Sequence, residues 1–301
     1  MDILHKPVSL LLFFLLGISW QFAFPDNRFI YKKINRFILY ISLPAIVLSK
    51  IPFIALNKTV LIPVGAAWLL FLGCIIFAYL MKRFLGYSNK TFACIVLCCG
   101  LGNTSFVGYP VLTYLYGAES LQYAIFVDQP GSFLIMSTLG IFMATYFNSG
   151  KLNWTKISKL LLTFPPFLVF IFSLFVPAKL LQAPILQVLN FIGGWMVPLA
   201  LLSLGMQFQF KISHIPIKPF FTGIIYKLIL GPLLIYILIF FVLKKQGMMA
   251  EVSVLECAMP PMITSSILAG NFGLDEELAA VFPTMGILIS IITLSIWTLI
   301  L

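Results

Sequence analysis

Long apolar runs separated by short polar connections make up most of the chain. Each run is close to the roughly 20 residues that a helix needs to cross a bilayer. The pattern therefore predicts an all-α polytopic membrane protein. Ten membrane-spanning helices are expected, at residues 7–25, 34–55, 59–81, 90–117, 120–147, 157–177, 184–206, 217–243, 250–270 and 276–300.

Glycine or proline interrupts the fourth and ninth predicted spans near their middles. The fourth reads Gly100-Leu101-Gly102-Asn103-Thr104 and reaches Pro110, and the ninth reads Glu256-Cys257-Ala258-Met259-Pro260-Pro261. Non-helical backbone at membrane depth is tolerated only where it is buried in protein or lines a cavity. Interrupted spans at corresponding places in two halves are typical of a transporter's binding site. For either break alone, an ordinary proline kink in a packed helix is the alternative.

Three short segments recur in the same order at an offset between 154 and 158 residues. The pairs are Leu43–Ser49 with Val197–Ser203, Val96–Gly100 with Val254–Ala258, and Gly117–Glu119 with Gly273–Asp275. They indicate two repeats of five helices, residues 1–150 and 151–301, joined by the hydrophilic stretch 148–156. Because five is an odd number, the repeats must insert with opposite orientations, which makes an inverted repeat.

Composition supports a membrane protein and the charges set its orientation. Hydrophobic residues make up 61% of the chain and charged residues 9%, whereas soluble domains carry about 25% charged residues. The connections after spans 1, 3, 5 and 7 are the more basic set, so the positive-inside rule places them in the cytoplasm and both termini outside. We expect the plasma membrane, specifically a bacterial inner membrane. The net charge of +10 follows from this topology, and nucleic-acid binding is not expected.

The five cysteines all lie in apolar segments and show no metal-ligand spacing: Cys74, Cys94, Cys98, Cys99 and Cys257. We expect small buried side chains without disulfides. No cofactor is expected apart from a coupling ion, H⁺ or Na⁺.

Few ionisable residues lie within the predicted spans, and three of them are candidates for function: Asp128, Lys227 and Glu256. Such residues are functional hypotheses by default, and they can exchange protons during transport. The alternatives are that a carboxylate merely pairs with Lys227 to hold the bundle, or that Lys227 snorkels to an interface.

The breaks offer helix ends for binding. Pro110 suits the first turn of a new half-helix, and Thr264 or Ser265 is expected to cap the second half of span nine. Half-helix N-termini favour anions, while the preceding carbonyls suit a cation or a proton donor. Asn103 can do both, since its amide donates and accepts. The candidate substrate- or ion-binding residues are Asn103, Thr104, Pro110, Pro260, Pro261, Thr264, Ser265 and Ser266.

The stretch Gly102-Asn103-Thr104-x-x-x-Gly108-x-Pro110 resembles the fourth-helix motif of the auxin efflux carrier family, which includes bacterial malate and malonate permeases. The segment from Gly193 to Met206, with Pro198-Leu199-Ala200 and Leu204-Gly205-Met206, is similar to a second pattern of that family. Met259-Pro260-Pro261 and the stretch from Asp275 to Ala280 also fit. The length and the lack of a large central hydrophilic loop look like the bacterial branch.

The resemblance implies the ten-helix inverted-repeat fold of the bile-acid/sodium symporters, with helices 4 and 9 crossing at their breaks beside the substrate. It implies an elevator motion, in which a transport domain of spans 3–5 and 8–10 slides past a scaffold of spans 1, 2, 6 and 7. Asn103 is implied as a substrate contact, and Pro110, Pro260 and Pro261 as crossover elements. Lys227 and Glu256 match no family motif securely.

We therefore predict a secondary active transporter of a small organic anion, a carboxylate, coupled to protons or the membrane potential rather than to sodium. One alternative is a sodium-coupled symporter of the bile-acid type. Another, from a different class, is a transporter-like membrane receptor. An enzyme is not expected, because no nucleophile–base set or metal motif appears. The expected partners are the organic anion and the lipid bilayer, and a homodimer is compatible with the sequence.

Overall fold

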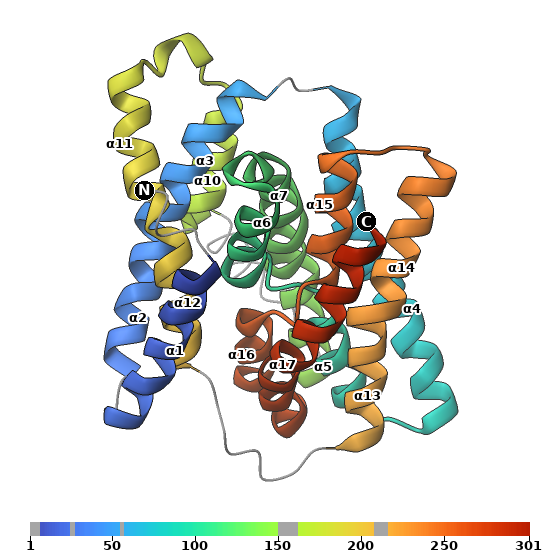
Figure 1. The fold of residues 1–301 in the computed structure, drawn as a ribbon. Coiled ribbons are helices and arrows are strands. Elements are labelled where there is room, and N and C mark those ends of the chain that lie inside the picture. The colour runs from blue at the N-terminus through green and yellow to red at the C-terminus, as the bar shows by residue number, and fades with distance from the viewer. Residues whose placement is uncertain (1–6, 25–27, 55–56, 150–161, 208–215) are drawn as a thin grey trace. The chain divides into compact units, whose positions relative to one another are not determined.

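The computed structural model describes residues 7–24, 28–54, 57–149, 162–207 and 216–301, coloured along the chain in Figure 1. These residues form helices and no strand. Six helical stretches are long and apolar enough to cross a membrane: Phe29–Phe53, Lys58–Leu85, Ala118–Phe147, Ala183–Met206, Ile217–Val242 and Glu276–Ile300. Each coincides with a span predicted from the sequence. The predicted linker lies outside the described residues from position 150 onward.

The helices group into two compact units, each built from several separate stretches of the chain. The first unit comprises residues 1–57, 105–125 and 162–209, and the second comprises 58–104, 126–161 and 210–301.

The first unit combines helices from the beginning of the chain, from the segment after the first break and from the middle of the chain. Its elements are α1 (Pro7–Ala23), α2 (Arg28–Phe37), the π-helical turn η1 (Ile38–Ser42), α3 (Leu43–Lys50), η2 (Ile51–Phe53), η4 (Thr104–Gly108), α6 (Tyr109–Tyr116), η5 (Ala118–Ser120), α7 (Leu121–Val127), α10 (Pro165–Ser173), η8 (Ala178–Leu180), α11 (Ala183–Gly194) and α12 (Met196–Met206). Thr104 and the end of α7 belong to the second unit.

Glycines allow close packing within the first unit. A Cβ atom on Gly17 of α1 would lie 2.2 Å from the Leu202 carbonyl oxygen of α12, so these two helices are in backbone contact. A Cβ on Gly193 of α11 would lie 2.7 Å from Ile46 of α3. Such small residues let membrane helices approach closely. Gly193 therefore allows close packing of α11 against α3.

The second unit holds both breaks, the first half of the fourth predicted span, the whole ninth span and the chain's last span. Its elements are η3 (Lys58–Val60), α4 (Leu61–Leu85), α5 (Asn89–Cys99), the π-helical segments η6 (Asp128–Phe133) and η7 (Met136–Gly140), α8 (Ile141–Ser149), α13 (Ile217–Ile225), the π-helical segment η9 (Tyr226–Leu230), α14 (Gly231–Tyr236), η10 (Ile237–Val242), α15 (Met248–Ala258), α16 (Ile263–Asn271) and α17 (Glu276–Ile300).

Local signals place the ends of these helices. α4 ends at Gly86, whose positive φ of 72° makes a left-handed C-cap. Ser88 caps α5 by accepting a hydrogen bond from the Thr91 amide at 3.0 Å. Asp275 caps α17 by accepting one from the Leu278 amide at 3.2 Å.

The core of the second unit is centred on α5. Its residues from Phe92 to Cys99 are all buried, and α4, α8, α13, α16 and α17 all contact it. The five cysteines of the chain are buried and free, as predicted.

Candidate functional site

The two breaks predicted from the sequence meet inside the second unit. Gly102 and Pro261 form an isolated antiparallel β-bridge. The Asn103 amide donates to the Pro260 carbonyl at 2.8 Å, and the Met262 amide donates to the Leu101 carbonyl at 3.3 Å. Each break therefore satisfies backbone groups of the other, which is what non-helical backbone at membrane depth requires.

The residues at each break explain why the helices stop there. Met259 takes an extended conformation, with ψ at 150°, because the residue before a proline avoids helical geometry. Pro260 and Pro261 have no amide hydrogen, so they present only acceptors. At the other break, Gly102 has no side chain, and the second break can approach its backbone closely.

Asn103 brings an unused hydrogen-bond donor to this crossing. Its side chain is 4% exposed, and within the described part of the chain its Nδ2 atom has no hydrogen-bond partner. Buried polar atoms are almost always paired in folded proteins. An amide nitrogen in this position is suited to donate to an oxygen of a bound anion.

Next to Asn103, a carboxylate is held by two side chains. Asp128, at the start of η6, accepts from the Thr104 hydroxyl at 2.5 Å and from Gln129 Nε2 at 2.7 Å. All three residues are buried. Thr104 therefore holds Asp128 in place, and the two predicted site residues are in direct contact.

Lys227 is fully buried, at 0% exposure. Its Nζ atom donates to the Cys257 carbonyl at 2.7 Å, in the last turn of α15. A Cβ atom on Gly102 would lie 3.0 Å from this Nζ and 3.1 Å from the Glu256 carbonyl oxygen. Lys227 is thus part of the crossing, and the snorkelling alternative is wrong, because η9 carries the residue into the interior of the second unit.

The Glu256 carboxyl group is also buried, with 1% of the residue exposed. Neither of its oxygens has a hydrogen-bond partner among the residues that the structure describes. Lys227 therefore hydrogen-bonds a helix carbonyl rather than the Glu256 carboxylate, and a simple ion pair that merely holds the bundle does not describe this residue.

Two side chains that the sequence analysis did not single out, Trp68 of α4 and Tyr226 of η9, tie the segments of Asp128 and Lys227 to α4. Trp68 Nε1 donates to the Pro130 carbonyl at 3.0 Å and so anchors η6. The Tyr226 hydroxyl donates to the Leu70 carbonyl at 2.6 Å and anchors η9. Both segments are π-helical, a form that is rare and often found at functional sites. For η6, the sequence carries one signal of an irregular, anchored segment: the polar residue Gln129 stands directly before Pro130 inside an apolar span.

The polar residues after the second break do not behave as predicted. α16 begins at Ile263 with Met262 as its N-cap and has no side-chain capping hydrogen bond. Ser265 Oγ instead donates to the Met262 carbonyl at 2.9 Å, and Thr264 is exposed. The predicted cap from Thr264 or Ser265 is therefore wrong, because the helix starts before both residues.

Ser266 is buried and faces the first interrupted helix. Its hydroxyl lies 3.1 Å from the Met262 carbonyl and 3.4 Å from Cys98 Sγ of α5. It ties α16 to α5.

Pro110 belongs to the first unit, where it is buried in the first turn of α6. Pro110 thus has its predicted place in the first turn of α6. The half-helix as a whole begins earlier than predicted, at Thr104, because the π-helical turn η4 precedes α6 without a gap.

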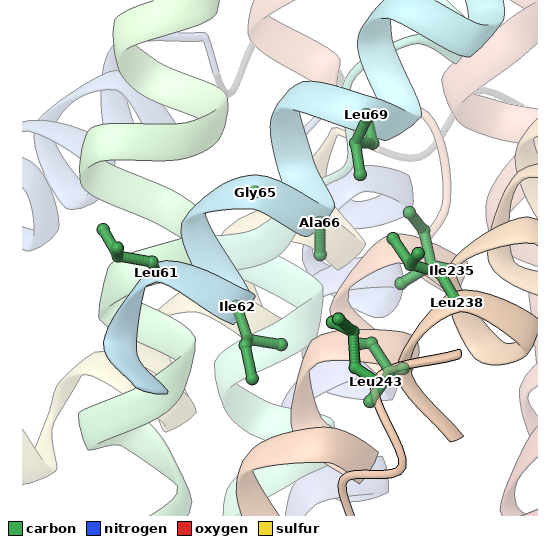
Figure 2. A pocket seen from close by; sticks show the side chains of 9 residues that line it. Leu61, Ile62, Gly65, Ala66, Leu69, Ile235, Leu238 and Leu243 are labelled. Atoms are coloured by element: carbon green, nitrogen blue, oxygen red, sulfur yellow. The ribbon is translucent and has the colours of Figure 1, made fainter. Parts of the chain in front are cut away.

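A separate apolar groove of about 240 Å³ lies between α4 and the α14–η10 helix, and Figure 2 shows the side chains that line it. They are Leu61, Ile62, Gly65, Ala66, Leu69, Ile235, Leu238, Ile239 and Leu243. No polar side chain lines the groove, so it is unsuited to an anion and resembles a surface for lipid acyl chains.

Comparisons with known proteins cover nearly the whole chain. Residues 14–298 match the sequence profile of a family described as "Membrane transport protein". A protein of Methanothermobacter thermautotrophicus described as an uncharacterized transporter is 28% identical over 277 residues, which cover 90% of this chain and 89% of that protein. A second uncharacterized transporter, from Methanocaldococcus jannaschii, is 29% identical over 275 residues, covering 88% of each chain.

Proposed function

Because the chain belongs to the membrane transport protein family, the auxin efflux carrier family, we propose that it is a secondary active transporter of a small organic anion, a carboxylate. Proteins of this kind move a solute rather than transform it, and both archaeal relatives are described as transporters. We propose that this transporter resides in the plasma membrane.

The observation that carries the substrate class is the unpaired amide of Asn103. Its Nδ2 atom is buried at the crossing of two interrupted helices and has no partner among the described residues. A carboxylate oxygen is a suitable acceptor for it. The N-terminus of α16 follows the same crossing, and the positive end of its helix dipole also favours an anion.

We propose the ten-helix architecture with inverted repeats for this transporter, both termini outside. The repeated segments support it, as does the matched backbone at Gly117 and Gly273, which both have positive φ, at 77° and 59°. Transport then follows an elevator motion, in which spans 3–5 and 8–10 move past spans 1, 2, 6 and 7. Coupling is to protons or to the membrane potential.

Uptake into liposomes tests this function. The purified protein is reconstituted and supplied with radiolabelled mono- and dicarboxylates under imposed pH, sodium and voltage gradients. We expect saturable flux of at least one carboxylate, which Asn103→Ala lowers strongly and Asn103→Asp abolishes, because a second negative charge repels the anion.

The matched control is Asn89→Ala, which removes the same side chain at an exposed position at the start of α5. It should transport like the wild type. Specific carboxylate binding without flux under every gradient would contradict the proposal and favour a receptor. Flux that requires sodium would favour the symporter of the bile-acid type.

A further inference from the structure

A single cation is enclosed at the crossing of the interrupted helices. Among the described residues, Lys227 is the only lysine or arginine that is buried. It is held there by η9, whose Tyr226 is fixed to α4 through the Leu70 carbonyl. Enclosing an ammonium group this completely is costly unless its surroundings supply oxygen acceptors. The acceptor groups around the Lys227 ammonium group therefore indicate its role.

Those groups are oxygen atoms at the C-terminal end of α15. The Cys257 carbonyl accepts from Nζ at 2.7 Å. The Glu256 carbonyl borders the same spot, since a Cβ on Gly102 would approach both it and Nζ within about 3.1 Å. Carbonyls in the last turn of a helix carry partial negative charge. The Glu256 carbonyl also accepts from the Met259 amide at 3.3 Å, whereas the acceptor used by Nζ is the Cys257 carbonyl.

Glu256 adds a buried carboxyl group in the last turn of α15, and neither of its oxygens has a hydrogen-bond partner within the described ranges of the chain. Unwound carbonyls together with a helix C-terminus are the atoms that bind a coupling cation in transporters with discontinuous helices. Here a side chain of the protein already donates to one of these carbonyls. Backbone carbonyls at a helix end are acceptors that a metal cation uses, and here the Lys227 ammonium group occupies one of them.

We propose that the Lys227 ammonium group is a tethered replacement for a coupling metal cation at the end of α15. The charge stays with the protein throughout the transport cycle, so no sodium ion needs to bind or be released. The inference deepens the proposed function and rests on it for its transport consequence. The cation site itself can be tested without any flux.

The first experiment measures the melting temperature of the full-length protein in detergent. Sodium, potassium, propylammonium and choline chlorides are compared at one ionic strength, for wild type, Lys227→Ala and Lys227→Gln. We expect the wild type to melt at the same temperature in all four salts. In choline chloride, both variants should melt at a lower temperature than the wild type. Increasing sodium should raise the melting temperature of both again, and propylammonium, which replaces the atoms removed, should raise that of Lys227→Ala.

The matched control is Lys218→Ala, which removes an exposed lysine near the start of α13. Its melting temperature should not respond to the choice of cation. A wild type stabilised by sodium over choline would overturn the proposal. So would variants that show no selective recovery with a small cation.

The second experiment measures anion uptake into liposomes. Wild-type flux should be unchanged when choline replaces sodium, a measurement that does not depend on any variant folding. Flux by Lys227→Ala should fall at least about tenfold and recover with the cation that restores its melting temperature. If Lys227→Ala loses anion uptake and no cation restores it, Lys227 would be an anion contact instead, and the proposal would be overturned. Absence of flux in every protein, with cation-selective recovery of the variants, would reject the proposed function but keep the cation site.

Discussion

The two breaks of the second unit lie against each other but are built from different residues. The first, from Gly100 to Asn103, is made by glycines, and the second, from Met259 to Met262, by prolines, which have no amide hydrogen. Along the backbone the exchange is mutual, since the Asn103 amide donates to the Pro260 carbonyl and the Met262 amide donates to the Leu101 carbonyl. The difference lies in the side chains: the first break adds the Asn103 Nδ2 donor, whereas the helix before the second break ends in the Cys257 carbonyl, which accepts from Lys227. We call the first break the donor side of the crossing and the second the acceptor side.

Gly102→Val should have the largest effect, because it fills the contact between the two breaks. A Cβ there would lie 3.0 Å from Lys227 Nζ and 3.1 Å from the Glu256 carbonyl oxygen, and the latter is backbone that cannot rotate away. Overpacking of this kind costs about 1–3 kcal/mol. We expect liposome uptake to fall toward the upper end of about 5- to 150-fold.

Its control is Gly65→Val in α4, where an added Cβ meets no atom within 4 Å. Uptake close to wild type by Gly102→Val would show that the two breaks need not touch.

Asp128→Asn tests the donor side of the crossing through Thr104. The neutral amide accepts more weakly from Thr104 and Gln129, and hydrogen bonds to charged groups contribute about 1.5–3 kcal/mol. We expect uptake to fall roughly tenfold, within the same range of coupling, measured at fixed protein density in the liposomes. Glu119→Gln, an acid-to-amide change at an exposed position, should leave uptake unchanged. An equal loss in both variants would assign the effect to net charge rather than to the site.

Gly286→Ala tests the acceptor side through α17, which packs against Pro261 of the second break. A Cβ on this residue of α17 would lie 2.5 Å from Pro261 Cδ, so the second break must shift. Replacing a helix-interior glycine by alanine also returns about 0.5–1 kcal/mol of stability, which offsets part of the strain. We expect a several-fold loss of uptake with little change in melting temperature.

Gly270→Ala is the matched control, since no atom lies within 4 Å of its added Cβ. Should Gly286→Ala transport normally, the position of Pro261 would not matter for the site.

Thr264→Ala should have the smallest effect. The residue is exposed and caps no helix, and such surface changes usually stay within about 0.5 kcal/mol. Ser266→Ala, which loses contacts to Met262 and Cys98, should lower the melting temperature more. A larger loss of uptake in Thr264→Ala than in Ser266→Ala would place the substrate on the exposed side of α16.

Six of the predicted spans match helices long enough to cross a membrane, because a long continuous apolar stretch favours a helix in a bilayer. The last predicted span, 276–300, coincides with α17, and the eighth, 217–243, ends one residue after η10. The positions of the two breaks were also visible, since glycine and proline mark them directly. Their pairing through Gly102 and Pro261 was not, because a contact between residues so far apart leaves no local signal.

The local geometry within the site was harder to predict. A cap by Thr264 or Ser265 follows from residue preference alone, but the extended backbone at Met259 and the two prolines let α16 begin earlier, at Ile263. The depth of Lys227 depends on η9 and its anchor to α4, which involve Tyr226 and Leu70. Hydropathy carries no information on such a contact, so the sequence alone does not distinguish a buried Lys227 from one near the membrane interface.

The bridge between Gly102 and Pro261 also has a consequence for biosynthesis. When a ribosome has inserted the first break, its partner is still 157 residues away, from Asn103 to Pro260. At synthesis rates of about 5–20 residues per second, the Asn103 amide and the Leu101 carbonyl wait roughly 8–30 s for the atoms that will pair with them. During that interval the nascent fourth span must rely on water, the insertion machinery or a chaperone. Native pairing at the first break therefore cannot form before the ninth span is synthesised.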